Sequence, residues 1–318
     1  MKKLLLILLM GIAVATTAQT KKDTIALLQR TAVLYNLQFT DAEADSMLSG
    51  IEEYTDIFAS MHQTAPPNNL LFPFAYEPAP PGFKIPANGQ KIAWDIPANV
   101  QLPANKTGLA FYSIPQLASL IKNKKITSVA LTQFFIDRIK KWDDSVKAVI
   151  TLTEELALQQ ARKADADLAK GIYHGPLHGI PYGLKDLFAV RGYKTTWGTT
   201  PYKDQVIDNN AFVYEQLTKA GAVLVAKLSL GALAFNDLWF GGRTNNPWNL
   251  RQGSSGSSAG SAAATAAGLL PFAIGTETYG SIISPSTRTG TTGLRPTFGA
   301  ISRSGAMVLS WSLDKAGP

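Results

Sequence analysis

Residues 253–268 read GSSGSSAGSAAATAAG, a run of small residues whose composition alone is typical of a flexible linker. The neighbouring sequence argues against a linker. The run leads into AAATAAG (262–268), which favours a helix without bulky side chains that can pack tightly against a sheet. An apolar segment, LLPFAIGT (269–276), and a second glycine–serine turn, ETYGSIISPS (277–286), follow directly. We therefore predict a turn, a helix and a strand inside a compact domain.

Glycine-rich turns before helices can also bind phosphate groups. Here no lysine follows the glycines as a P-loop requires, and the pattern GxGxxG does not occur. Phosphate binding is therefore not expected at this turn.

The sequence before this run alternates between strand-like and helical segments. Strands are expected over 148–152, 180–187 and 223–227, and helices from Ser113, over 127–142, over 153–169 and over 212–220. Such alternation predicts an α/β fold in which helices cover a sheet. The final residues, LDKAGP, read as a loop without a terminal helix or strand, and we expect the chain to be truncated there.

The composition of the 318 residues excludes several classes of function. Without cysteine the protein has no disulfide, no thiol nucleophile and no lipoprotein anchor at an N-terminal cysteine. The chain has only three histidines, His62, His174 and His178. This small number argues against a Ser-His-Asp triad and against a three-histidine zinc site. The net charge of +7 is spread along the chain, so nucleic acid is not an expected partner. A serine nucleophile with a lysine base remains possible.

The N-terminal third is organised differently. Lys2 and Lys3, the apolar run from Leu4 to Val14 and the small residues up to Ala18 predict a signal peptide over residues 1–18. The run is too short for a stable membrane span, although a buried strand or a membrane anchor is the alternative. A helical stretch is expected over about 22–61, with a capping box at Thr40 and Glu43. Nine of the 18 prolines lie between Pro66 and Pro103, a segment that should be irregular and should wrap a surface or link parts.

Three separated blocks closely resemble the amidase signature family: GPLHGIPYGLKDL (175–187), GSSGSSAGSAAA (253–264), and GTETYGSIISPS (275–286) followed by GLRPTFGAISRSG (293–305). The resemblance runs from about Phe111 to the C-terminus. It implies an α/β/α fold with a mixed sheet, a Ser–cis-Ser–Lys triad, and no metal or organic cofactor. Together with the predicted signal peptide, the resemblance leads us to expect an exported protein with an N-terminal extension over 19–108 and an amidase domain over 109–318.

Matched block to block, the resemblance places the nucleophile on Ser281, the cis-serine relay on Ser257 and the base on Lys185. It places the oxyanion-binding backbone on Thr278, Tyr279 and Gly280, together with the N–H of Ser281, and supporting roles on Gly256, Ser258 and Thr276. The implied reaction is hydrolysis of a carboxamide or amide bond through an acyl-enzyme. Lys185 can take a proton only when neutral, so its pKa must fall from roughly 10.4 through burial or positive neighbours.

The sequence departs from the common family pattern at Glu277, Tyr279 and Ile283, where Asp, Gly and Arg are frequent. Tyr279 should narrow the space beside the nucleophile. The substrate, a small-molecule or peptide amide, and the oligomeric state are not readable from the sequence. Three alternatives stay open: an amidotransferase subunit of the same family, which the export signal opposes, a non-catalytic binding protein on an amidase scaffold, and an inactive fragment.

The export signal makes a direct prediction. Mass spectrometry of periplasmic or extracellular material should find a mature N-terminus near Gln19, because the small residues before it suit signal peptidase. An intact Met1 on protein recovered from the cytosol would contradict export and strengthen the amidotransferase alternative.

Overall fold

The computed structural model describes residues 20–63 and 92–318, which fall into two compact units that are considered separately. The predicted signal peptide and most of the proline-rich segment lie outside the described residues. Among the helices of the described ranges, none is both long and apolar enough to cross a membrane.

The first unit contains two helices, α2 (Lys21–Val33) and α3 (Asp41–Gln63). The predicted helical stretch over 22–61 contains two helices, because the chain leaves the helix after Val33 and Asn36 adopts a positive φ of 56°. The predicted capping box is confirmed: the Glu43 N–H donates to Thr40 Oγ1 (3.3 Å), and the Thr40 N–H donates to Glu43 Oε2 (2.8 Å). An N-cap residue begins a new helix, so a single helix cannot run through Thr40.

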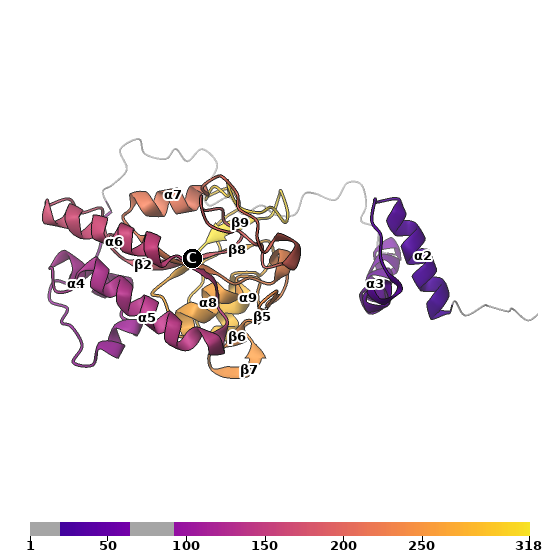
Figure 1. Cartoon of the computed structure of the whole chain (residues 1–318), viewed down its shortest axis with the longest axis horizontal. Coiled ribbons are helices and arrows are strands. Elements are labelled where there is room, and N and C mark those ends of the chain that lie inside the picture. Colours follow the sequence, from indigo (N-terminus) through magenta and orange to yellow (C-terminus); the bar gives the residue numbers. More distant parts are fainter. Residues whose placement is uncertain (1–19, 64–91) are drawn as a thin grey trace, which may run out of the picture. The chain divides into compact units, whose positions relative to one another are not determined.

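The second unit is a mixed α/β structure, which confirms the predicted fold class (Figure 1). Its helices are η1 (Lys106–Phe111), α4 (Ile114–Lys122), α5 (Ser128–Val146), α6 (Glu154–Ala169), η2 (Thr200–Tyr202), α7 (Phe212–Lys219), η3 (Ala232–Ala234), α8 (Ala259–Ala266) and α9 (Ile283–Thr289). The main sheet contains β1 (Val149–Leu152), β2 (Pro181–Lys185), β3 (Val223–Leu228), β8 (Ala273–Glu277) and β9 (Lys315–Gly317). Two small ribbons pair β4 (Leu238–Trp239) with β5 (Gly242–Arg243), and β6 (Asn245–Asn246) with β7 (Asn249–Gly253).

The main sheet has the strand order β1-β3-β2-β8-β9. The three central strands are parallel, and the two outer strands run antiparallel to their neighbours. The expectation that the chain ends in a loop is wrong, because Lys315–Gly317 forms β9 beside β8 (Figure 1). A strand of three residues has no visible periodicity, and only its pairing with a distant strand defines it.

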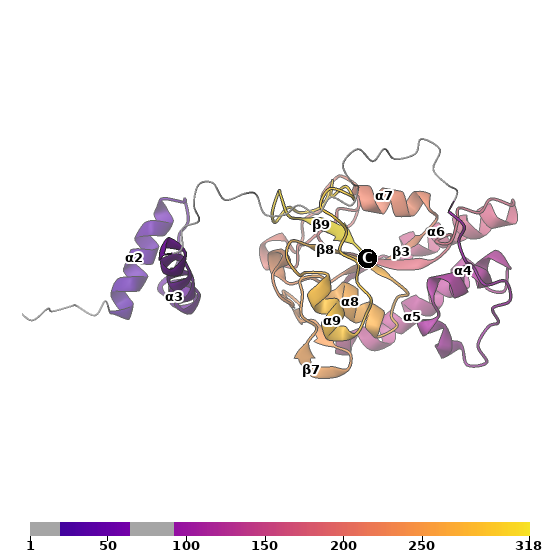
Figure 2. The same cartoon turned by 180° about the vertical axis from the view of Figure 1, so that it is seen from behind.

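Helices cover both faces of this sheet. Val223, Val225 and Leu228 of β3 contribute to a core with side chains of α4, α5, α6 and α8. Leu224 on the same strand joins Tyr182 and Leu184 of β2 in a second core, with side chains of α7 and the loop after β2. Alternate residues of a strand point to opposite faces, so β3 contributes side chains to both cores. Both views place α7 on the opposite side of the strands from α5 and α8 (Figures 1 and 2).

Residues 92–105 form neither helix nor strand, yet the second unit holds them by polar contacts. Lys125 Nζ donates to the Val100 carbonyl oxygen (2.7 Å), and Asn123 Nδ2 donates to that of Ala98 (3.1 Å). The Tyr112 hydroxyl donates to the Gln101 carbonyl oxygen (3.1 Å). This part of the proline-rich segment therefore wraps the surface of the unit, as one of the two predicted roles requires.

The small residues of the run 253–268 allow α8 to approach the sheet closely. All six residues from Ala259 to Ala264 are buried. A Cβ atom on Gly260 would overlap the carbonyl oxygen of Ala148 and the amide nitrogen of Ser229, both of which are backbone atoms. The run is therefore a packing element, as predicted, and not a linker.

Replacing Gly260 by Ala should lower the free energy of unfolding of the second unit by about 1–3 kcal/mol, because backbone atoms cannot move aside as a side chain can. Chemical denaturation followed by circular dichroism would measure the change. Gly50→Ala is the matched control, since a Cβ atom on Gly50 in α3 meets nothing within 4 Å. An unchanged denaturation midpoint for Gly260→Ala would contradict the close approach.

Candidate active site

Lys185, the last residue of β2, lies in a completely buried position surrounded by hydroxyl groups. Its Nζ atom lies 2.8 Å from Ser257 Oγ, 3.0 Å from Ser258 Oγ and 3.0 Å from Thr276 Oγ1. Burial lowers the pKa of Lys185 well below its usual value, and the charges of Asp314 and Glu277 oppose this only in part. No carboxylate of the described residues forms an ion pair with this amine. The site therefore favours the neutral amine, which is a base.

Ser257 reaches Lys185 from the turn that precedes α8. The Gly256–Ser257 peptide bond is cis, as the family resemblance implies. A Cβ atom on Gly256 would overlap the carbonyl oxygen of Asn236, so the turn requires glycine here. The Gly231 N–H donates to the Ser257 carbonyl oxygen at 3.3 Å and ties this turn to the segment after β3.

Ser258 has a different set of partners from Ser257. Its hydroxyl donates to the Thr276 carbonyl oxygen (2.9 Å) and accepts the Thr276 N–H (3.1 Å). The single hydroxyl proton of Ser258 is thus engaged by backbone, and toward Lys185 this oxygen can only accept. Ser258 and Thr276 together position the amine.

Ser281 lies in the turn between β8 and α9, across a small cavity from Ser257. The two serines line this cavity together with Thr276, and the Ser258 N–H donates to the Ser281 carbonyl oxygen at 3.0 Å. Within the described residues, no hydrogen bond joins the Ser257 and Ser281 hydroxyls. The structure thus links Lys185 to Ser257 directly and places Ser281 at the same cavity without a direct bond.

The backbone between β8 and Ser281 has N–H groups that are available to donate hydrogen bonds. Gly280 has a φ of +127°, a conformation that L side chains rarely adopt. The N–H groups of Tyr279, Gly280 and Ser281 have no backbone partner among the described residues. Such N–H groups can bind an oxyanion that develops beside the serine. Tyr279 itself is 78% exposed and stands at the surface beside this turn.

Glu277 holds the turn in place. Its buried carboxylate accepts the N–H groups of Ile282 and Ile283, both at 2.9 Å, and pairs with Arg295 at 3.0 Å. Burial raises the pKa of Glu277, but the hydrogen bonds from Ile283 and Ile282 and the Arg295 charge outweigh it and lower the pKa overall. Glu277, which stands where Asp is frequent in the family, thus connects the end of β8 to the start of α9 across the turn.

Three charged residues at the cavity were not predicted from the sequence: Arg303, Asp314 and Lys315. Asp314 accepts the Thr278 hydroxyl (2.7 Å), and Lys315 Nζ donates to the Thr278 carbonyl oxygen (2.9 Å). Arg303 lies in the block GLRPTFGAISRSG that carries the family resemblance. The signal for the other two was the Asp–Lys pair in LDKAGP, and its position beside Thr278 depends on β9 pairing with β8.

Solved structures that resemble this fold include amidases. Peptide amidase from Stenotrophomonas maltophilia is 36% identical, with a TM-score of 0.62 over 64% of this chain and 44% of that chain. Fatty acid amide hydrolase is 28% identical, with a TM-score of 0.61 over 65% of this chain and 37% of that chain.

The family model described as Amidase matches residues 130–318, and the chain belongs to this family. The glutamyl-tRNA(Gln) amidotransferase subunit from Coxiella burnetii is 44% identical over 209 residues, which cover 65% of this chain and 43% of the relative. The corresponding subunit from Methylococcus capsulatus is 43% identical with the same coverage. The chain thus matches less than half the length of these curated relatives.

Glu277→Gln should destabilise the protein in a pH-dependent way. The folded state lowers the pKa of Glu277, so the carboxylate adds stability above its unfolded value of 4.5, and this stability is lost as the pH falls through the folded pKa. The variant should lose about 1–3 kcal/mol of unfolding free energy at pH 7, because hydrogen bonds to a charged group are lost. Denaturation curves at several pH values would test this. A difference from wild type that persists unchanged well below pH 4.5 would contradict the role of the charge.

Proposed function

We propose that this protein is a serine amidohydrolase that cleaves a carboxamide or amide bond through an acyl-enzyme on Ser281, with Ser257 as proton relay and Lys185 as base. The observation that carries the proposal is the fully buried Lys185 amine, whose nearest partners are three hydroxyls and no carboxylate. A lysine in such a place loses its proton readily and becomes able to accept one.

The hydrogen bonds around Lys185 support proton transfer from the Ser257 hydroxyl to the Lys185 amine. A neutral amine has two N–H donors and one lone pair. Ser258 can only accept from this amine because its own proton is engaged by the Thr276 carbonyl. When a second N–H is donated to Thr276 Oγ1, the lone pair of a neutral amine is left for Ser257 Oγ, which lies 2.8 Å away, and the Ser257 hydroxyl can then donate to it. Ser257 Oγ is in turn free to accept the proton of Ser281.

The reaction then follows in balanced steps. Ser281 Oγ attacks the amide carbonyl carbon as its proton passes to Ser257 and the Ser257 proton passes to Lys185. The N–H groups of Tyr279, Gly280 and Ser281, together with that of Thr278, are assigned to the oxyanion, and each such donor is worth about 2.7–4 kcal/mol. The proton returns to the leaving amine as the C–N bond breaks. Water then hydrolyses the ester with the same relay.

The proposed substrate is a small-molecule or peptide amide. The names of the solved neighbours, peptide amidase and fatty acid amide hydrolase, support amide substrates of both kinds. Tyr279 lies two residues before the proposed nucleophile, but its side chain is 78% exposed and does not line the cavity, so we assign it no role in restricting the substrate. No metal or organic cofactor is assigned to the reaction, and export to the periplasm or the exterior belongs to the same proposal.

A second candidate is a component of a glutamyl-tRNA(Gln) amidotransferase, which the 44% identity to a protein of that name favours. The two functions differ in what they need. An amidohydrolase should release amine from simple amides by itself, whereas an amidotransferase component should act with its partner subunits and a tRNA substrate.

Variants of the three residues should separate their roles. Ser281→Ala should abolish labelling by an alkyl fluorophosphonate, because it removes the only atom proposed to become acylated. Lys185→Ala should keep residual reactivity, about 10²–10⁴-fold reduced, that rises with pH as hydroxide replaces the base. Ser257→Ala should lower the labelling rate by a similar factor. The double variant Lys185→Ala/Ser257→Ala should lose much less than the two single losses multiplied together, because the residues act as one unit.

Ser284→Ala is the matched control, since this exposed serine lies in the first turn of α9, three residues after Ser281, and its hydroxyl hydrogen-bonds to that of Ser255. Its labelling rate should equal that of wild type. Intact labelling of Ser281→Ala would place the nucleophile elsewhere and overturn the proposal.

A further inference from the structure

Thr278 begins the turn over residues 278–281, called here the oxyanion turn, and it is held by two adjacent residues of another segment. Its hydroxyl donates to Asp314 Oδ1 (2.7 Å), and its carbonyl oxygen accepts a hydrogen bond from Lys315 Nζ (2.9 Å). Pairing of β9 with β8 brings the two segments together, since Lys315 lies opposite Glu277 in the register. The side chain and the backbone of Thr278 are thus both fixed by this neighbouring segment.

Asp314 is a firm anchor for the threonine hydroxyl. Its side chain is only 9% exposed, and its carboxylate accepts the N–H groups of Leu309 (2.8 Å) and Ser310 (3.0 Å). Arg303 approaches the same carboxylate at 3.7 Å. A carboxylate with three hydrogen-bond donors and a nearby cation has little freedom to turn, so the position of Thr278 follows that of Asp314.

Lys315 acts on the backbone of the oxyanion turn. The Thr278 carbonyl and the Tyr279 N–H belong to one peptide group, and a peptide group is planar. The hydrogen bond from Lys315 to the carbonyl oxygen therefore also fixes the direction of the Tyr279 N–H. This N–H has no backbone partner among the described residues and is one of the donors assigned to the oxyanion. A donor at the carbonyl oxygen also polarises the peptide group and strengthens its N–H as a donor.

The other end of the oxyanion turn is held by different residues. Glu277 accepts the N–H groups of Ile282 and Ile283, and the Ser258 N–H donates to the Ser281 carbonyl oxygen. These bonds hold the chain from the proposed nucleophile onward, whereas the contacts of residue 278 hold the start of the turn.

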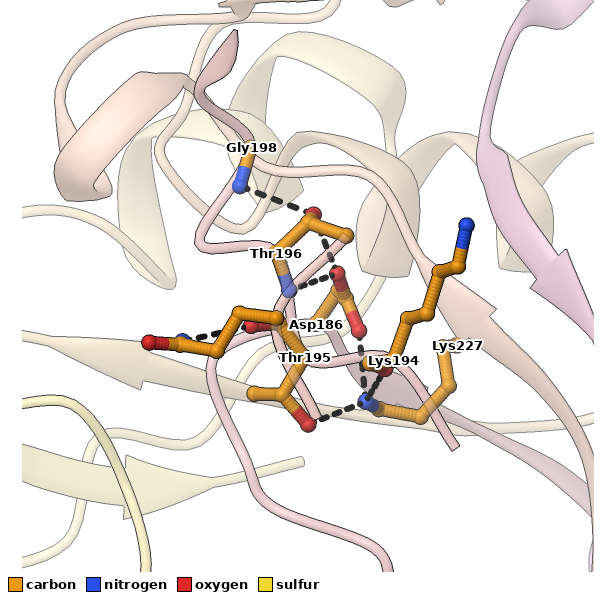
Figure 3. A network of polar contacts seen from close by, with 7 residues as sticks. Asp186, Lys194, Thr195, Thr196, Gly198 and Lys227 are labelled. Atoms are coloured by element: carbon orange, nitrogen blue, oxygen red, sulfur yellow. Dashed lines mark hydrogen bonds and ion pairs between the residues drawn. The ribbon is translucent and has the colours of Figure 1, made fainter. Parts of the chain in front are cut away.

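A second pair of threonine and aspartate, which follows β2, offers a comparison (Figure 3). Thr196 donates its hydroxyl (2.5 Å) and its N–H (2.8 Å) to Asp186 Oδ2, while Asp186 Oδ1 pairs with Lys227 at 2.5 Å. Lys227 Nζ also donates to the Lys194 carbonyl oxygen and to Thr195 Oγ1. In the part of the chain that the structure describes, these side-chain contacts hold the loop after β2, and none of them reaches the oxyanion turn.

We propose that Asp314 and Lys315 are positioning residues of the oxyanion site, which hold Thr278 by its hydroxyl and its carbonyl and so fix the direction of the Tyr279 N–H. This inference rests on the proposed function, in which that N–H binds the oxyanion. Both residues act through Thr278, and neither is assigned a contact with a reacting atom.

The test uses the whole 318-residue chain and saturation kinetics with an alkyl fluorophosphonate, which separate the affinity for the probe from the rate of Ser281 phosphonylation. Rates are compared on the high-pH plateau, because the Asp314 charge raises the pKa of Lys185. Thr278→Val removes the hydroxyl and should lower the rate about 10- to 100-fold, with little change in affinity. Thr278→Ser keeps the hydroxyl and should retain more of the rate than Thr278→Val.

Variants of the two proposed residues follow the same logic. Lys315→Met should lower the rate of phosphonylation, and Lys315→Arg should restore part of it, because arginine can still donate to the carbonyl oxygen. The double variant Asp314→Ala/Thr278→Val should lose about as much as Asp314→Ala alone. Two single losses that multiply would instead show that Asp314 acts independently of Thr278 and would overturn the inference. Where Asp314→Ala does not fold by circular dichroism, Thr278→Val compared with Thr278→Ser decides.

Thr196→Val is the matched control, because it also removes a threonine hydroxyl from a buried carboxylate, but one that does not hold the oxyanion turn. It should lower the free energy of unfolding and leave the rate of phosphonylation of the folded protein close to that of wild type. Equal rates in Thr278→Val and Thr196→Val would show a merely structural hydrogen bond and overturn the inference while leaving the proposed function intact. Wild-type protein that is not labelled at Ser281 would instead refute the proposed function, and the inference would fall with it.

Discussion

A lysine amine can be buried only if it has a counter-ion or loses its proton, and the site in this protein is organised around that constraint. Lys185 is fully buried, and the groups that contact its Nζ atom are hydroxyls and a carbonyl. These neutral groups satisfy the hydrogen bonds of the amine without stabilising a positive charge as a carboxylate would. Burial in the core therefore lowers the pKa of the Lys185 amine and favours its neutral, basic form.

The arrangement of the backbone follows from the need to bring hydroxyls to this amine. Parallel pairing of β2 with β8 places Lys185 and Thr276 on neighbouring strands. The serines must then arrive from a third segment, and the glycine–serine run before α8 is small enough to enter. Gly256 lies against the Asn236 carbonyl oxygen, and Gly260 lies against the backbone of Ala148. Larger residues at these two positions would hold Ser257 away from the amine.

Carboxylates around the site are engaged by other partners. Asp186 is bound by Lys227 and Thr196, and Glu277 by Arg295 and two backbone N–H groups. Asp314 accepts the N–H groups of Leu309 and Ser310 and the hydroxyl of Thr278. Each negative charge thus stabilises a turn or a neighbouring cation. As a result, the two buried lysines differ: Lys227 is paired with a carboxylate, and Lys185 is not.

The sequence by itself determined the class of fold and the identity of the central residues. Periodicity and apolar runs predicted α5, α6, α7 and the strands β1, β2, β3 and β8, and the blocks around Lys185, Ser257 and Ser281 carried the family resemblance. These features are local, because a capping residue, a strand pattern or a motif is complete within a few residues. The start of α3 was predicted from its capping box at Thr40, whereas the end of α2 at Val33 was not.

Only the tertiary structure decided which charges meet. Nothing in the sequence marks Lys227 as the partner of Asp186, and β9 has no periodicity from which the placement of Asp314 and Lys315 beside Thr278 could be predicted. Lys185 and Lys227 are both lysines at the ends of apolar strands and look alike in the sequence. Their difference arises from segments far apart in the chain, because the charge state of a buried amine depends on the groups that surround it in space.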